Sequence, residues 1–163
     1  YLRYYKMRLN IDTKLRSTKK EFLVVISQFI IIALHLIKFN LLNQKLIQGE
    51  FLTLNYISNF LITLSLIIIV FSVKELWKSL SPMPRPKENS KLITSGIYRL
   101  FRHPMYYSLI IISFSFFIKS LTIYNLILSI LLTFIISNKI KIEEEYLIKR
   151  FHNYTLYKNE VKI

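Results

Sequence analysis

Long apolar stretches bounded by basic segments constrain this chain more than any other feature of its sequence. The stretches cover residues 22–39, 51–73 and 105–138, and hydrophobic residues make up 53% of the chain. At a helical rise of about 1.5 Å per residue, each stretch is close to or above the roughly 30 Å needed to cross the apolar core of a bilayer. A soluble protein of 163 residues could not cover so much apolar surface with its remaining polar side chains. The sequence therefore predicts an integral membrane protein.

The third stretch is too long for a single crossing. We expect it to fold into two short spans, residues 105–118 and 121–137, with a turn near Lys119 and Ser120. The alternative is one long tilted helix that leaves the membrane, and it would place Lys119 at membrane depth. The predicted fold is all-α, a polytopic membrane protein with about four transmembrane helices. It includes a C-terminal helical hairpin, followed by a cytoplasmic C-terminal helix.

The distribution of basic residues favours this topology. The chain has 23 Lys and Arg against 9 Asp and Glu, a formal net charge of +14. With four spans, one side of the membrane carries both termini and every basic residue except Lys38, Lys45 and Lys119. Because cytoplasmic loops hold the excess of Lys and Arg, we expect a multi-pass protein with both termini in the cytoplasm, in a bacterial inner membrane or the endoplasmic reticulum. Nucleic-acid binding is the rival explanation of the charge, but the basic residues are spread along the flanks of the spans.

Composition excludes several kinds of site. The chain has no Cys, which removes disulfides, thiol nucleophiles and Cys-based zinc sites, and we expect no metal. Its two glycines, Gly49 and Gly96, are too few for Gly-rich dinucleotide or phosphate loops. Gly96 follows Thr94 and Ser95 in a predicted turn, where glycine permits a positive φ. No signal peptide is recognised, and a start at Tyr1 rather than Met is expected of a trimmed chain or a fragment.

A proline-rich segment divides the chain into two parts. Prolines alternate with other residues over positions 81–86, which favours an extended spacer over a helix. We expect an N-terminal part, residues 1–80, with a basic segment and the first two spans. The remaining part, residues 81–163, would hold a polar loop, the hairpin and the C-terminal helix.

The first of two segments that are too polar for lipid contains an Arg-His-Pro sequence. The two segments are residues 90–107 and 139–157. Pro104 fits the first turn of a helix, so His103 lies at a helix N-terminus, where free N–H groups attract anions. Arg102 adds positive charge there, and Tyr98 and Tyr106 can flank a flat ring. On these residues alone, an equally good explanation is that Arg102 reaches lipid headgroups, the tyrosines form an interfacial belt and His103 only caps the helix.

The second polar segment predicts a helix with Glu143 on its apolar face. That face carries Glu143, Leu147, Phe151 and Tyr154 at helical spacing, and Lys139 shares it. A carboxylate on an apolar stripe is rarely buried without a partner or a task, so Glu143 is a candidate catalytic group. The alternative is that Glu143 only pairs with Lys139 near the start of the helix. Glu144 can belong to this face or to the exposed one, where Glu145 and Lys149 form an ordinary pair without function.

Two motifs in these segments carry a family resemblance. The first is GIYRLFRHPMY, residues 96–106, preceded by KLITS. The second is an acidic helix with Glu143, Glu144, Leu147, Phe151, Tyr154 and Tyr157. Together, and separated by a hairpin of the right length, they resemble the isoprenylcysteine carboxyl methyltransferases and the related membrane phospholipid methyltransferases. The resemblance runs from Pro84 to Val161, and the first two spans share only their hydrophobicity with it.

The resemblance implies a cofactor, S-adenosylmethionine, held between the Arg-His-Pro loop and the acidic helix on the cytosolic side. The implied cofactor contacts are Ser90, Lys91, Leu92, Ile93, Tyr98, His103, Pro104, Met105 and Tyr106. Arg102 joins them as a cation suited to the cofactor's carboxylate. Glu143 would lie at the acceptor's carboxylate or amine with Glu144 beside it, and Lys139 takes the position of a substrate-side arginine. A lysine cannot bind a carboxylate with two parallel bonds as arginine does, which weakens the inference of a carboxylate acceptor.

The expected function is methyl transfer from S-adenosylmethionine to a lipophilic acceptor, either a prenylcysteine-like carboxylate or a membrane lipid. Glu143 would position or deprotonate this acceptor. Whether O, N or S is methylated stays open, as does the oligomeric state. One alternative is an NADPH-dependent sterol-type reductase, although those enzymes usually carry Asn before the motif tyrosine, where this chain has Met105. The other is a non-catalytic membrane binding or scaffold protein.

Overall fold

The part of the chain that the structure describes is helical and contains no β-strand. The structure is a computed structural model, and it describes residues 19–35, 37, 46–47, 51–77 and 91–162. Residues 19–34 are helical and are called here the N-terminal helix. The other elements are α2 (Leu52–Leu76), the 3-10 helix η1 (Gly96–Arg99), α3 (Pro104–Ser120), α4 (Ile123–Arg150) and α5 (Tyr154–Glu160). The prediction of an all-α protein is confirmed.

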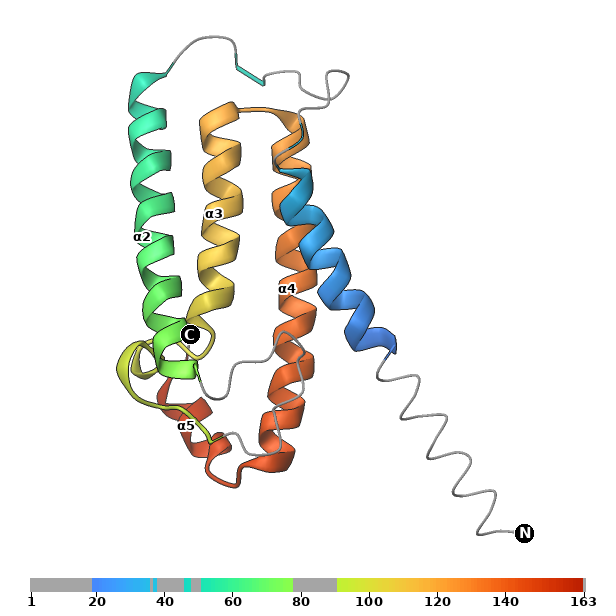
Figure 1. Ribbon diagram of the computed structural model, residues 1–163, viewed down its shortest axis with the longest axis vertical. Coiled ribbons are helices and arrows are strands. Elements are labelled where there is room, and N and C mark those ends of the chain that lie inside the picture. Colours follow the sequence, from blue (N-terminus) through green and yellow to red (C-terminus); the bar gives the residue numbers. More distant parts are fainter. Residues whose placement is uncertain (1–18, 36, 38–45, 48–50, 78–90, 163) are drawn as a thin grey trace, which may run out of the picture.

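Three long helices form the body of the molecule. Figure 1 shows α2, α3 and α4 side by side, with α3 antiparallel to both of its neighbours. The N-terminal helix runs obliquely across α4 in this view and packs against both α3 and α4, and α5 lies at the end of the bundle where α4 ends. Because α2 ends, α3 begins and α4 ends at this same end, three chain segments that are far apart in sequence meet there. We call it the charged end of the bundle.

Small residues allow α2 and α3 to approach closely. Buried serines recur every seven residues on both helices: Ser58, Ser65 and Ser72 on α2, and Ser108 and Ser115 on α3. Small side chains at such spacing let two helical backbones pack against each other. The hydroxyls of Ser58 and Ser72 donate to carbonyls one turn earlier, Leu54 and Ile68, so burying them leaves few polar groups unsatisfied. The hydroxyl of Ser65 is the exception, since it is buried and has no hydrogen-bond partner among the described residues.

The break between α3 and α4 lies close to the predicted turn. Helix α3 ends at Ser120, and Leu121 takes a positive φ of 50° that reverses the chain. Thr122 then caps α4 by accepting a hydrogen bond from the backbone N–H of Asn125 at 3.3 Å. Lys119 points to α2 and donates to Asn59 Oδ1 at 3.2 Å. Residues 105–138 therefore form parts of two helices, not one.

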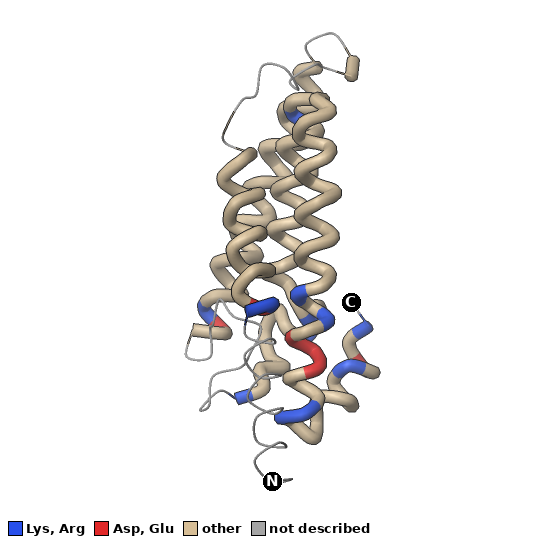
Figure 2. The backbone as a smooth tube through the Cα atoms, turned by 90° about the vertical axis from the view of Figure 1, so that its right-hand side faces the viewer, with Lys and Arg blue, Asp and Glu red and all other residues tan. Residues whose placement is uncertain are grey.

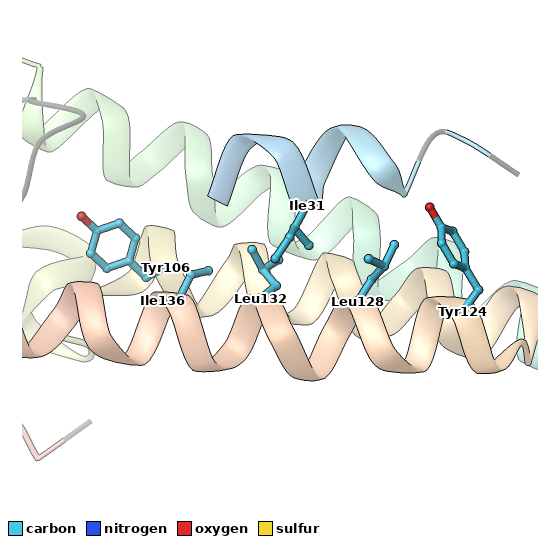
Figure 3. Packing of buried hydrophobic residues seen from close by; sticks show 6 residues of the cluster. All are labelled: Ile31, Tyr106, Tyr124, Leu128, Leu132 and Ile136. Atoms are coloured by element: carbon cyan, nitrogen blue, oxygen red, sulfur yellow. The ribbon is translucent and has the colours of Figure 1, made fainter. Parts of the chain in front are cut away.

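An apolar cluster joins the N-terminal helix to α3 and α4. Ile31 points from the N-terminal helix toward Leu128 and Leu132 of α4, as Figure 3 shows. Ile136 and Tyr106 extend the cluster toward the charged end, and Tyr124 closes it at the other. Tyr124 also donates from its hydroxyl to the carbonyl of Leu34 at 2.7 Å.

Two of the helices, α2 and α4, are long and apolar enough to cross a membrane. Helix α3 is apolar but shorter. In Figure 2 the backbone positions of the charged residues, among those described, gather at one end of the bundle and are almost absent along its length. The four-span topology and the membrane hairpin stay predictions, as do the two domains, whose boundary falls outside the described residues.

The C-terminal helix differs from the prediction. Residues 139–150 do not start a new helix, because they continue α4 without a break from Ile123 to Arg150. The chain then turns at Phe151, and α5 begins at Tyr154. The expected face of Glu143, Leu147, Phe151 and Tyr154 is therefore wrong at Tyr154, which belongs to a second helix. The apolar spacing continues through Tyr154, so spacing alone does not mark the end of α4.

Candidate functional site

The two polar segments meet at the charged end of the bundle. A hydrogen bond joins them where the hydroxyl of Tyr106, in the first turn of α3, donates to Glu143 Oε2 of α4 at 2.7 Å. Tyr106 is buried, while Glu143 is partly accessible. Among the described residues, the other carboxylate oxygen of Glu143 accepts no hydrogen bond. The protein therefore orients the Glu143 carboxylate through one oxygen, and the other oxygen can bind a ligand.

Glu144 has a different set of partners. Its carboxylate lies 3.1 Å from Arg102 Nε, 3.4 Å from His103 Nε2 and 2.6 Å from Lys158 Nζ. The contact with Arg102 is an ion pair without an aligned hydrogen bond, whereas Lys158 donates directly. The side chain of Glu144 is 11% exposed, so its charge depends on these partners. Glu144 thus links the start of α3, the end of α4 and α5.

The guanidinium of Arg102 binds backbone carbonyls of the protein. Its Nη1 donates to the carbonyl oxygens of Lys158 at 3.2 Å and Val161 at 2.6 Å. These carbonyls lie at the C-terminal end of α5, where a helix has no backbone donors of its own to satisfy them. The structure therefore gives Arg102 a part in holding α5, alongside the expected part in holding an anionic ligand.

His103 lies at the N-terminus of α3, as the sequence indicated. Pro104 occupies the first turn of the helix and His103 is its N-cap residue, but the imidazole makes no capping hydrogen bond. Instead, the buried ring stacks on Tyr106, with ring centroids 5.7 Å apart and an interplanar angle of 12°. Met105, between them in sequence, packs against the apolar cluster of α3 and α4.

Lys139 is buried one turn before Glu143. Its ammonium donates to Gln28 Oε1 of the N-terminal helix at 2.9 Å and lies 4.9 Å from the centroid of the Tyr106 ring. Lys139 and Glu143 thus have separate hydrogen-bond partners, which argues against the alternative that Glu143 exists only to pair with Lys139.

The predicted loop residues are distributed unevenly around this centre. Leu92 packs against the apolar cluster of Tyr154, Tyr157 and Val161 beside α5. Lys91 is exposed and Ile93 is partly buried. Ser90 lies outside the described residues. The structure therefore brings Tyr98, Arg102, His103, Tyr106, Lys139, Glu143 and Glu144 together, with Leu92 at the margin.

A hydrogen bond between two tyrosines joins η1 to α5 beside these residues. The hydroxyl of Tyr157 donates to the carbonyl of Tyr98 at 2.6 Å. Burial, with the field of Glu143 as a second cause, raises the pKa of Tyr98 well above its usual range. Burial also raises the pKa of Tyr157 to about 12. Both phenols therefore stay neutral near pH 7 and can donate hydrogen bonds.

Gly96 has the predicted positive φ, +59°, and a side chain there would meet a neighbour. A Cβ added at Gly96 would lie 2.6 Å from Glu75 Oε1 at the end of α2. The left-handed conformation costs an L-residue about 1–2 kcal/mol, so we expect Gly96→Ala to lower the free energy of unfolding by about that amount. Denaturant unfolding in detergent measures it. The Glu75 side chain can move away, so we expect the same loss of unfolding free energy when Gly96→Ala is made in a Glu75→Ala background. If the loss disappears in that background, the clash with Glu75 and not the backbone conformation causes it.

Sequence reasoning missed two members of the charged end. Gln28 is a polar residue inside the first apolar stretch, and such a residue in a span is a signal of a buried partner that sequence reasoning did not use. Lys158 carried no signal, because nothing in the local spacing relates it to Glu144. In the described ranges, no group of three or more His, Asp or Glu side chains could hold a metal ion.

Comparison with known proteins identifies the region that carries these residues. Residues 53–154 match the family model described as phospholipid methyltransferase. The matched region runs from the start of α2 to the first residue of α5, so it includes the Tyr106–Glu143 pair and leaves out the N-terminal helix. No curated protein and no solved structure matches the chain.

Proposed function

This chain belongs to the phospholipid methyltransferase family, and from that membership we propose that it is a membrane methyltransferase that uses S-adenosylmethionine. The acceptor is a lipophilic molecule, either a membrane lipid or a prenylcysteine-like carboxylate. The observation that carries the proposal is the hydrogen bond from Tyr106 to Glu143, because it joins the two motif segments at one point.

The residues around Glu143 suit a positively charged donor. S-adenosylmethionine carries a sulfonium, an ammonium, a carboxylate and a flat adenine ring. The stacked rings of His103 and Tyr106 lie next to Glu143 and would offer aromatic surface to a cation or a flat ring. Arg102 supplies positive charge next to the N-terminus of α3 for a carboxylate, and the imidazole of His103 lies beside it.

Methyl transfer depends more on aligning the donor with the acceptor than on covalent catalysis by the protein. When bound, the donor supplies an electrophilic methyl group that passes to the acceptor heteroatom as the bond between sulfur and the methyl carbon breaks. Glu143 orients the acceptor and, where the acceptor carries a proton, receives it. Tyr106 fixes the angle of the Glu143 carboxylate, and Lys139 adds positive charge one helical turn away. Glu144 keeps α5 against this centre through Arg102 and Lys158.

The membrane arrangement supports access from two phases. We propose that the charged end lies at the cytoplasmic surface and that four helices, including α2 and α4, cross the bilayer with both termini on the cytoplasmic side. The charge at one end of the bundle and its absence along the helices support this orientation (Figure 2). A water-soluble donor then reaches Glu143 from the cytoplasm, and a lipophilic acceptor reaches it from the bilayer.

Ligand-induced stabilisation of the full chain in detergent tests the proposal. S-adenosylmethionine at 100 times its Kd should raise the free energy of unfolding by about 2.7 kcal/mol, and NADPH should leave it unchanged. Membranes that contain the protein should then transfer labelled methyl groups from the donor into the lipid or protein fraction. Stabilisation by NADPH alone would establish the reductase alternative, and no stabilisation by either ligand would favour a non-catalytic protein.

A further inference from the structure

A buried polar pair connects the N-terminal helix to α4. Gln28 is 4% exposed and Lys139 is 3% exposed, and the lysine ammonium donates to the amide oxygen at 2.9 Å. These two residues are 111 positions apart in the chain. A buried ammonium is unfavourable unless polar groups surround it, so this contact has a cost that apolar packing would avoid.

The pair leads directly to the candidate centre. The Lys139 ammonium that donates to Gln28 also lies 4.9 Å from the centroid of the Tyr106 ring. The hydroxyl of Tyr106 in turn donates to Glu143. A cation over an aromatic face is attracted to it, so the position of the ammonium influences the position of the ring. Gln28, Lys139, Tyr106 and Glu143 therefore form one continuous series of contacts.

Other contacts hold the N-terminal helix against the bundle on both sides of Gln28. Toward the charged end, the hydroxyl of Tyr146 donates to Glu21. In the other direction Ile31 enters the apolar cluster (Figure 3). Beyond it, Ser113 Oγ of α3 lies 2.8 Å from His35 Nε2. The amide of Gln28 is thus presented to Lys139 from a helix that is anchored at both ends.

We propose that Gln28 is a positioning residue for methyl transfer and that the N-terminal helix is part of the catalytic unit. Gln28 holds the Lys139 ammonium over Tyr106 and thereby keeps the Glu143 carboxylate in its reactive orientation. This inference rests on the proposed methyltransferase function. It goes beyond that function because residues 19–34 lie outside the region that matches the family.

Three substitutions at one position test the role. Gln28→Leu removes the acceptor at nearly the same size, Gln28→Asn keeps the amide but withdraws it by one methylene, and Gln28→Glu restores an acceptor at full length. Ser27→Ala is the matched control, because it removes a polar group from the same turn whose hydrogen bond, to Val24 O at 3.0 Å, stays within the helix.

The readouts are kcat and KM for methyl transfer, the Kd for S-adenosylmethionine and the thermal unfolding midpoint, all on the full chain in detergent. Loss of a hydrogen bond to a charged group corresponds to roughly a 10- to 100-fold effect, so we expect kcat to fall by about that factor in Gln28→Leu and Gln28→Asn. Donor Kd should be unchanged, Gln28→Glu should recover most of kcat, and Ser27→Ala should behave as wild type.

Each result has a definite meaning. A wild-type chain without methyl transfer would refute the proposed function and this role with it. An active wild type with unchanged kcat in Gln28→Leu would overturn the positioning role alone. If Gln28→Leu does not fold, Gln28→Asn decides, because its polarity is unchanged. Parallel losses of donor affinity and unfolding midpoint, with no recovery in Gln28→Glu, would show a purely structural contact and would also overturn the inference.

Discussion

Replacing Glu143 with glutamine should reduce kcat by at least about 100-fold while S-adenosylmethionine still binds. The amide oxygen of glutamine can accept the hydrogen bond that Tyr106 now donates to Glu143 Oε2, so the local geometry should survive. What is lost is the negative charge and the capacity to receive a proton. Because Glu143 is partly accessible and makes no ion pair with Lys139 in the structure, the free energy of unfolding should change little.

Turnover with labelled donor and equilibrium donor binding measure this effect on the same preparation. Glu145→Gln is the matched control, since Glu145 is an exposed carboxylate only two positions away on α4. Full activity in Glu143→Gln would remove Glu143 from the chemistry. A loss of donor affinity in proportion to kcat would instead make it part of the cofactor site.

At the adjacent position, Glu144→Gln should act on stability. The Glu144 carboxylate faces Arg102 and Lys158, with His103 beside them, and a neutral amide would leave the two cations without a counter-charge. Removing one member of a largely buried ion cluster is strongly destabilising, by about 3 kcal/mol here, where Lys158 is partly solvated. The loss should be concentrated in α5, because Lys158 lies in its last turn and Arg102 binds the carbonyls of Lys158 and of Val161, the residue that follows the helix.

Denaturant unfolding measures the loss, and limited trypsin digestion locates it. Cleavage after Lys158 should become faster in Glu144→Gln, while cleavage in Glu143→Gln and Glu145→Gln should match wild type. Three consecutive glutamates would then have three distinct roles, in turnover, in stability and in neither. Equal proteolysis in all three variants would show that Glu144 does not hold α5.

Local sequence predicted much of the charged end because its signals are local. Pro104 can begin a helix and cannot continue one, so His103 had to lie at a helix N-terminus. Gly96, the first residue of η1, has the positive φ that a glycine in a turn permits. The interruption at Lys119 and Ser120 separated α3 from α4 because a charge at membrane depth is unfavourable. The meeting of the Arg-His-Pro segment with the acidic segment was also predicted, from the resemblance of both to one family.

The C-terminal region could not be predicted in the same way. Periodicity placed Tyr154 on the face of Glu143, but α4 ends at Arg150 and Tyr154 lies in α5, packed against Tyr157 and Val161. Helical spacing says which residues share a face while the helix continues. It does not say where a tertiary contact, such as the attachment of α5 to Arg102 and Glu144, makes the chain turn.

The sequence by itself determined that the chain is helical and that its apolar segments are long enough for a bilayer. It also predicted that charged residues lie beside the Arg-His-Pro segment. Only the tertiary structure decided which partner each charged group takes. Successive residues on α4 are rotated by about 100°, so Glu143 meets Tyr106 on one side while Glu144 meets Arg102 and Lys158 on another. Lys139 meets Gln28 from 111 positions away. Such choices depend on which helices are neighbours in space, and that is a property of the assembled bundle.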